Sequence, residues 1–279
     1  MPELPEVEVV RRGLEKLLFG KAHLSGGLPL IEKIEFLRRD LRDPMPIKAL
    51  KRLEGAQILA IHRRAKYLLI ETDRGGILSH LGMTGTWREA PVGTEKDHDH
   101  IYLYLSTGVR LAYRDPRRFG IFETYDVRQQ SQSPRLKNLG PEPFDALFSG
   151  AFLTKFFSGK KATVKAVLMD QRCVVGVGNI YASEVLFKAR ISPLRKAGRI
   201  TSEQSEVIVQ TIRKTLQTAI DQGGSSISDF YSFNGQSGKF QNSHEVYDRS
   251  GEPCRKCGTK IRSKVIAGRS TYWCPTCQK

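Results

Sequence analysis

The first six residues, Met1-Pro2-Glu3-Leu4-Pro5-Glu6, hold a group that can act as a nucleophile. Removal of Met1, which a small second residue favours, leaves Pro2 with a terminal secondary amine. A terminal amine has a pKa of about 8, against about 10.4 for a lysine, so a useful fraction is unprotonated at neutral pH. The same residues also suit an ordinary helix start, because proline fits the first turn and acids favour the positive end of the helix dipole. Both interpretations stay open on these residues alone.

The C-terminal region carries four cysteines in the pattern Cys254-x2-Cys257-x16-Cys274-x2-Cys277. Two such pairs, each on a tight knuckle, bring four thiolates to one ion from the two sides of a hairpin. The spacing predicts one structural zinc ion in a zinc ribbon, in preference to disulfides or an iron site. The remaining cysteine, Cys173, lies in an apolar run and is interpreted as a buried core residue.

Two loops offer side chains that suit contact with nucleic acid. Asp115-Pro116-Arg117-Arg118-Phe119-Gly120 supplies cations for phosphate or base contact and a ring that can stack in a duplex. Met83, within His80-Leu81-Gly82-Met83-Thr84-Gly85, can supply a second apolar wedge. For Met83 and Phe119, packing in a core is the alternative interpretation.

The glycine-containing segment Val175-Gly176-Val177-Gly178-Asn179-Ile180-Tyr181 does not fit a dinucleotide fingerprint, because Tyr181 stands where a third glycine is needed. Paired glycines nevertheless let a backbone approach a phosphate closely. We expect Asn179 to cap the following helix and to present its amide to the same phosphate. A plain tight turn before a helix explains the segment equally well.

Three other polar residues give weaker signals. Lys66 is predicted to begin a strand, where the alternative is a surface lysine without a role. His98 and His100 flank an aspartate just before a strand. We interpret both histidines as polar contacts, because no third metal ligand lies near them in the sequence.

The pattern of apolar residues indicates the elements that position these groups. Helical spacing places Leu4, Val7, Val10 and Leu14 on one face of an N-terminal helix. From about residue 31 to 125 the chain reads as short strands, with Arg74-Gly75-Gly76 as one of the turns, which predicts an all-β sandwich. Beyond residue 150 the pattern is helical over 164–169, 179–189 and 203–222, the last with a possible Thr201/Gln204 capping box. The fold class is therefore α+β.

The composition indicates a polyanionic partner. The 279 residues include 45 Lys and Arg against 29 Asp and Glu, a net charge of +16, which favours nucleic acid over an anionic membrane. No apolar run approaches the length of a membrane span, and the acidic N-terminus is unlike a signal peptide. We therefore expect a cytoplasmic protein that associates with the nucleoid when it binds DNA. From Arg249 to Lys279 eight bases accompany one acid, Glu252, so the zinc ribbon itself is expected to contact nucleic acid.

Taken together, the motifs resemble the formamidopyrimidine-DNA glycosylase family. They are Pro2-Glu3-Leu4-Pro5-Glu6-Val7-Glu8, the segments 80–85 and 115–120, the segment Gly176–Glu184 and the four cysteines, in the family's order along essentially the whole chain. The resemblance implies a bifunctional repair enzyme that excises 8-oxoguanine and ring-opened purines from duplex DNA and then cuts the strand by β,δ-elimination. It also implies a monomer with a catalytic β-sandwich domain (1–130), a linker (131–150), a helix-two-turn-helix domain with a lesion-capping loop (151–244) and a zinc finger (245–279).

The resemblance also implies a role for each motif residue. Pro2 is the nucleophile that forms a Schiff base, Glu3 is its acid/base partner, and Glu6 supports the site electrostatically. Lys66 and Arg269 are the proton donors of β- and δ-elimination. The residues implied in DNA binding are His98, Arg117, Lys160 and Asn179, and those that fill the gap left by the extruded base are Met83, Arg117 and Phe119. The segment Gly223–Gly238 is implied to close over the extruded base.

Two alternatives remain open. The related endonuclease VIII type shares the Pro2 chemistry but prefers oxidised pyrimidines; Leu4 and the set Met83, Arg117 and Phe119 argue against it. A non-catalytic zinc-ribbon DNA-binding protein is the second alternative, and it has no need of the catalytic residues.

Overall fold

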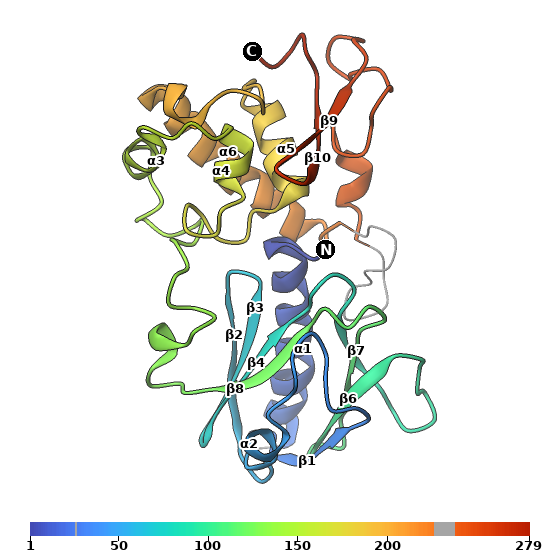
Figure 1. The fold of residues 1–279 in the computed structure, drawn as a ribbon. Coiled ribbons are helices and arrows are strands. Elements are labelled where there is room, and N and C mark those ends of the chain that lie inside the picture. The colour runs from blue at the N-terminus through green and yellow to red at the C-terminus, as the bar shows by residue number, and fades with distance from the viewer. Residues whose placement is uncertain (26, 226–237) are drawn as a thin grey trace. The chain divides into compact units, whose positions relative to one another are not determined.

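The computed structural model describes residues 1–25, 27–225 and 238–279, and its helices and strands have the predicted α+β composition. Within the described residues the chain divides into two compact units (Figure 1). Unit 1 is Met1–Lys137 with Gly223–Lys239, and unit 2 is Asn138–Gln222 with Phe240–Lys279. The predicted lesion-capping segment falls largely on residues 226–237, which lie outside the described residues.

Unit 1 is a β-sandwich. In the part of the chain that the structure describes, its strands form two antiparallel four-stranded sheets, ordered β1-β6-β7-β5 and β2-β3-β4-β8. The first sheet consists of β1 (Ile31–Phe36), β5 (Thr86–Glu89), β6 (Asp99–Leu105) and β7 (Arg110–Arg114). The second consists of β2 (Ile58–Arg64), β3 (Tyr67–Thr72), β4 (Gly75–His80) and β8 (Ile121–Tyr125).

The N-terminal helix α1 (Leu4–Ser25) packs on both sheets of the sandwich, through β2 and β3 on one side and β5 on the other. Val7, Val10 and Leu14 are fully buried in the same core as Trp87. Burial of an aliphatic side chain stabilises the fold by about 1.5–3 kcal/mol. This packing fixes the first turn of α1, and hence the residues before it, on the sandwich. A short helix, α2 (Ile47–Lys51), joins the two sheets.

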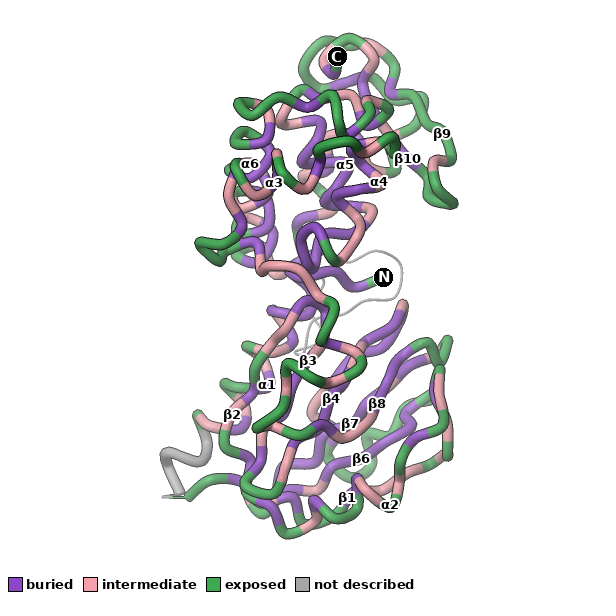
Figure 2. The backbone as a smooth tube through the Cα atoms, turned by 60° about the vertical axis from the view of Figure 1, so that its left-hand side comes forward, coloured by how far each residue is buried: buried purple, intermediate pink, exposed green. Residues whose placement is uncertain are grey.

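Unit 2 is helical and ends in a β-hairpin. Its helices are α3 (Gly150–Phe157), α4 (Val164–Leu168), α5 (Asn179–Lys188) and α6 (Ser202–Asp221). The predicted capping box is confirmed, because the Thr201 side chain accepts from the Gln204 N–H at 3.2 Å and the Gln204 side chain accepts from the Thr201 N–H at 3.1 Å. The hairpin pairs β9 (Arg262–Ile266) with β10 (Arg269–Trp273), and Figure 2 shows β9 largely exposed.

Short 3₁₀ turns occur at Gln130–Gln132, Ala197–Arg199 and Phe240–Ser243. Among the described residues, no helix combines the length and apolar character needed to cross a membrane.

Candidate functional site

The N-terminal residues form a buried polar cluster at the start of α1. Pro2, Glu3 and Glu6 are buried. One oxygen of Glu6 accepts the Glu3 N–H at 2.8 Å, and the other accepts the Ser225 N–H at 2.7 Å. The Glu6 carboxylate therefore holds the backbone beside Pro2 and also the backbone at residue 225.

The terminal amine of this chain lies in a set of opposing charges. The pKa of the Met1 amine is lowered from its ordinary value of 8.0, chiefly because burial penalises the charged form. The carboxylates of Glu3 and Glu6 raise this pKa, whereas Lys66 and Arg117 lower it. The structure thus brings four of the predicted site residues within electrostatic reach of the N-terminus, and the balance favours an unprotonated, nucleophilic amine.

Lys66 lies in a turn and not at the start of a strand, as the sequence analysis predicted that it would. It belongs to the two-residue turn between β2 and β3, where Arg64 pairs with Tyr67 and Ala65 adopts a φ of 54°. The predicted strand start is therefore wrong, because the strand resumes at Tyr67. Lys66 is only 7% exposed, so it is not an ordinary surface lysine either.

The two predicted DNA-contact loops present the expected side chains. Phe119 is 43% exposed, and the Arg117 guanidinium lies 4.9 Å from the centre of its ring. Arg117 is exposed and Met83 is half-buried. An exposed ring beside a cation can stack on a base and contact a phosphate or base edge.

His98 and His100 differ in their surroundings. The buried His100 ring pairs through Nε2 with the Asp115 carbonyl at 2.9 Å, and burial lowers its pKa. His98 is exposed and has a φ of 70°. In the residues that the structure describes, neither histidine belongs to a group that could hold a metal ion.

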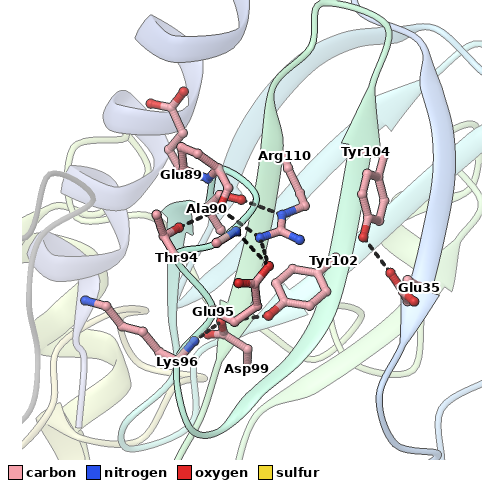
Figure 3. A network of polar contacts seen from close by, with 12 residues as sticks. Glu35, Glu89, Ala90, Thr94, Glu95, Lys96, Asp99, Tyr102, Tyr104 and Arg110 are labelled. Carbon is pink, nitrogen blue, oxygen red and sulfur yellow. Dashed lines mark hydrogen bonds and ion pairs between the residues drawn. The ribbon is translucent and has the colours of Figure 1, made fainter.

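A polar network fixes the segment that leads to His98 (Figure 3). The Arg110 guanidinium stacks 4.4 Å from the Tyr102 ring and donates to the Ala90 carbonyl and to Glu95. Asp99 accepts the Tyr102 hydroxyl at 3.0 Å and the Lys96 N–H at 2.9 Å. These contacts tie the segment between β5 and β6 to Asp99 of β6 and Arg110 of β7, and so fix the place at which His98 precedes β6.

Asn179 does not cap α5, contrary to the expectation from the sequence. Gly178 occupies the N-cap position, and the Asn179 amide instead donates to the Ser270 carbonyl at 3.0 Å. The buried Lys165 ammonium donates to the Asn179 amide oxygen, to the Ser270 carbonyl at 3.0 Å and to the Thr271 hydroxyl at 2.8 Å. Within unit 2, these hydrogen bonds connect Asn179 to Ser270 and Thr271, the two residues that follow Arg269. Arg269 itself is exposed and pairs with Ile266 beside the turn of the β9–β10 hairpin.

Lys160 is held where α3 ends. Its ammonium lies 4.5 Å from the centre of the Phe156 ring, its N–H donates to the Phe157 carbonyl and its carbonyl accepts the Gly198 N–H at 3.1 Å. A lysine with a fixed backbone and a half-buried stem is suited to contact a phosphate.

The four C-terminal cysteines converge on one point. Their sulfur atoms all lie within 4.8 Å of one another, with Cys254 Sγ 3.9 Å from Cys277 Sγ and Cys257 Sγ 3.4 Å from Cys274 Sγ. Tetrahedral zinc with Zn–S bonds of about 2.3 Å places its sulfur ligands about 3.8 Å apart. The arrangement therefore fits one structural zinc ion, as predicted. Cys173 is buried, as predicted, and burial raises the pKa of its thiol to about 12.

The sequence reasoning missed two buried charges that hold unit 2 together, Lys165 and Glu184. Each interrupts an otherwise apolar helical run, and that interruption was the available signal. The Glu184 carboxylate accepts the N–H groups of Glu245, Val246 and Tyr247 at 2.9–3.0 Å. This carboxylate thereby fixes to α5 the segment that enters the zinc finger.

We expect Glu184→Ala to lower the free energy of unfolding by about 3 kcal/mol, because three N–H groups lose their acceptor in a buried place. Urea unfolding of the zinc-loaded protein measures this change. Glu203→Ala, at an exposed position in the first turn of α6, is the matched control and should change stability by less than about 1 kcal/mol. Equal effects of the two substitutions would show that the Glu184 contacts contribute little.

Comparisons with known proteins cover the chain from end to end. Residues 1–122 match the formamidopyrimidine-DNA glycosylase N-terminal domain, residues 139–231 the H2TH domain of the same glycosylase, and residues 251–279 a zinc finger found in FPG and IleRS. The predicted fold, including the helix-two-turn-helix region and the zinc finger, is therefore confirmed.

Individual relatives agree with these family models. A formamidopyrimidine-DNA glycosylase of Bdellovibrio bacteriovorus is 53% identical over 279 residues, with 100% of both chains covered. The Lactococcus lactis Fpg bound to DNA with an abasic site is 36% identical, with a TM-score of 0.88 and 99% of both chains covered. The Lactococcus lactis Fpg bound to FAPY-dG-containing DNA is 34% identical, also with a TM-score of 0.88, over 99% of this chain and 100% of that one.

Proposed function

This chain belongs to the formamidopyrimidine-DNA glycosylase family, and on that premise we propose how its own residues carry out the reaction. It is a DNA glycosylase that excises oxidised purines, 8-oxoguanine and formamidopyrimidines, and it has abasic-site lyase activity. The observation that carries the mechanism is the surroundings of the N-terminus, where Pro2 is buried and Glu3, Glu6, Lys66 and Arg117 all affect the Met1 amine.

In the first step, the Pro2 amine attacks C1′ of the damaged nucleotide and the bond from C1′ to the base breaks. The product is a Schiff base between Pro2 and the opened sugar. Glu3, which lies beside the amine, accepts and returns the protons that this exchange requires. An unprotonated amine is essential, and we propose that the surroundings that lower the pKa of the Met1 amine act in the same way on the Pro2 amine once Met1 is removed.

In the later steps the Schiff base acts as an electron sink. It acidifies the proton on C2′, so that a modest base can remove it and the 3′ phosphate leaves. We assign the proton donation of β-elimination to Lys66, which is close enough to affect the terminal amine. We assign that of δ-elimination to Arg269 beside the turn of the β9–β10 hairpin.

The partner in this proposal is duplex DNA that contains a damaged base. His98, Arg117, Lys160 and Asn179 contact its phosphates, and Met83, Arg117 and Phe119 fill the space of the extruded base. Extrusion costs a few kcal/mol of stacking and pairing, which inserted apolar and aromatic groups offset. The charge of +16 supplies affinity that falls as salt rises.

We also propose that the protein is a monomer that acts on the nucleoid in the cytoplasm. Its proposed domain limits are 1–130, 131–150, 151–244 and 245–279. A single chain carries both the nucleophile and the DNA-contact residues, so one copy is sufficient for the reaction. Four thiolate ligands are most stable in a reducing compartment, which supports the cytoplasm.

The test uses purified protein whose free Pro2 terminus has been verified by mass spectrometry. It is incubated with sodium borohydride and a duplex that carries 8-oxoguanine opposite cytosine, and we expect a covalent protein–DNA adduct. Absence of the adduct would overturn the Pro2 mechanism. Trapping confined to duplexes with oxidised pyrimidines would instead favour the specificity of endonuclease VIII.

The pH dependence of trapping follows from the charges at the N-terminus. Burial lowers the pKa of the Met1 amine, and we expect the same surroundings to lower the pKa of the Pro2 amine that replaces it, so the rate of Schiff-base formation should rise with pH to a plateau. Arg117→Gln removes a charge that lowers this pKa, so the midpoint should move upward. Glu6→Gln removes a charge that raises it, so the midpoint should move downward. Single-turnover rates at several pH values measure the midpoints, and shifts of the same sign in both variants would contradict this explanation.

A further inference from the structure

The Asp115 carboxylate lies between the two loops that carry Met83, Arg117 and Phe119. These loops, residues 80–85 and 115–120, are called the wedge loops below. Asp115 is fully buried. One of its oxygens accepts the Thr84 hydroxyl at 2.6 Å, and the other accepts the Gly120 N–H at 2.8 Å. The carboxylate therefore closes its own loop and ties it to the loop of Met83.

Thr84 extends this connection to a DNA-contact residue. Its hydroxyl donates its proton to Asp115 and accepts the Arg117 N–H at 3.2 Å. One buried hydroxyl thus joins the backbone of Arg117 to the wedge loop of Met83, and the orientation of the hydroxyl depends on the acceptor that Asp115 supplies.

The backbone of Asp115 also contacts the segment that carries His98. The Asp115 N–H donates to the His98 carbonyl at 3.0 Å, and the Asp115 carbonyl pairs with His100 Nε2 and accepts the Arg118 N–H at 3.1 Å. Asp115 therefore contacts each of the three segments of unit 1 that carry a proposed DNA-contact residue.

The two wedge loops also touch directly. A Cβ atom on Gly82, whose φ is 61°, would lie 2.4 Å from the carbonyl carbon of Phe119. A Cβ atom on Gly120 would lie 1.8 Å from the Tyr113 hydroxyl, which donates to the His80 carbonyl at 3.1 Å. The two loops therefore pack closely at Gly82 and Gly120, where a side chain would have no room.

We propose that Asp115, acting through Thr84, is a positioning residue that holds the wedge loops as one rigid unit, so that extrusion of a stacked base depends on it. The proposal rests on the proposed roles of Met83, Arg117 and Phe119. These side chains offset the lost stacking only if they enter the duplex together. A duplex that already lacks the base needs less of this help than one with a stacked, paired lesion.

The test substitutes Thr84 and Asp115 and compares two substrates. Thr84→Val keeps the shape but removes the hydroxyl, and Asp115→Asn replaces one of the two acceptor positions by a donor. We expect each variant to slow single-turnover excision of 8-oxoguanine opposite cytosine about tenfold, the loss typical of one hydrogen bond. Strand cleavage at a preformed abasic site should change less than about twofold. Thr84→Ser retains the hydroxyl and should restore excision.

Thr72→Val is the matched control. Thr72 is the buried last residue of β3, and its hydroxyl, like that of Thr84, donates one hydrogen bond and accepts an N–H: it donates to the Gly75 carbonyl and accepts the Arg74 N–H. Its substitution should leave the ratio of the two rates unchanged at a similar loss of thermal stability. Equal slowing of both substrates by Thr84→Val, or no slowing of either, overturns the role of Asp115. Failure of the unsubstituted protein to form the borohydride adduct overturns the Pro2 mechanism instead.

Discussion

An extension of the chain before Met1 should lower both borohydride trapping and excision of 8-oxoguanine by at least about 10³-fold. With Met1 in place, the Pro2 nitrogen is a planar amide and is not nucleophilic. The only terminal amine then lies one or more residues away, at least about 3.8 Å from its productive place. A misplacement of 1 Å alone can cost about 10²-fold. Single-turnover kinetics with the 8-oxoguanine duplex measure this loss.

Two controls separate chemistry from binding. Pro2→Gly with Met1 removed keeps a terminal amine at the same backbone position, so trapping should persist at a reduced rate. Affinity for a duplex with an uncleavable abasic analogue should change less than about threefold in the extended protein, because no proposed DNA-contact residue is altered. Efficient trapping by the extended protein, or an adduct that maps to a peptide other than the N-terminal one, would contradict the assignment of Pro2.

Features that depend on neighbouring residues could be predicted from the sequence. The capping box of α6 involves residues three apart, and the buried face of α1 follows from helical spacing. The cysteine pattern fixed the zinc site, because each pair forms its own knuckle and only one long-range contact, between the two pairs, has to be made. In each case the short segment specifies its own geometry.

The turns were harder to place. The sequence predicted a hairpin turn at Arg74-Gly75-Gly76. A turn that includes Arg74 does separate β3 from β4, but Gly75 and Gly76 pair with Thr72 and Glu71 as part of β4. Gly76 is there because a Cβ atom would lie 2.2 Å from the Tyr125 ring on β8. A glycine required by a distant neighbour has the same appearance in a sequence as a glycine required by a turn.

The contacts that orient the candidate site were not predictable from local patterns. Asn179 has the residue type of a helix cap, yet its partner Ser270 lies 91 residues further along the chain. Thr84 and Asp115 are 31 residues apart, and Glu6 and Ser225 are 219 apart. Each of these pairs forms only when whole helices, strands and loops pack together. The spacing of the residues along the chain therefore does not predict the contact.

Removal of zinc should abolish high-affinity DNA binding while unit 1 stays folded. Cys257→Ser leaves three thiolates for the ion, and apparent zinc affinities of structural fingers, about 10–16 kcal/mol, are largely folding energy of the finger. Once the β9–β10 hairpin unfolds, Arg269 has no fixed position and the Lys165 and Asn179 contacts to Ser270 are lost. We expect affinity for the abasic-analogue duplex to fall at least about 10²-fold, because phosphate contacts from several bases are lost together.

The two tryptophans distinguish unfolding of the zinc finger from unfolding of unit 1. Trp87 is fully buried in the core of unit 1, and Trp273 lies on β10 in the finger. In a Trp273→Phe protein, emission from Trp87 should not change on treatment with a chelator, whereas the unsubstituted protein should show a red shift from Trp273.

Cys173→Ala, which removes a buried thiol outside the four ligands, is the matched control and should retain one zinc ion per chain. A Cys257→Ser protein that keeps its zinc and its DNA affinity would show that three thiolates hold the finger. Loss of Trp87 burial on chelation would instead show that the stability of the sandwich depends on the finger.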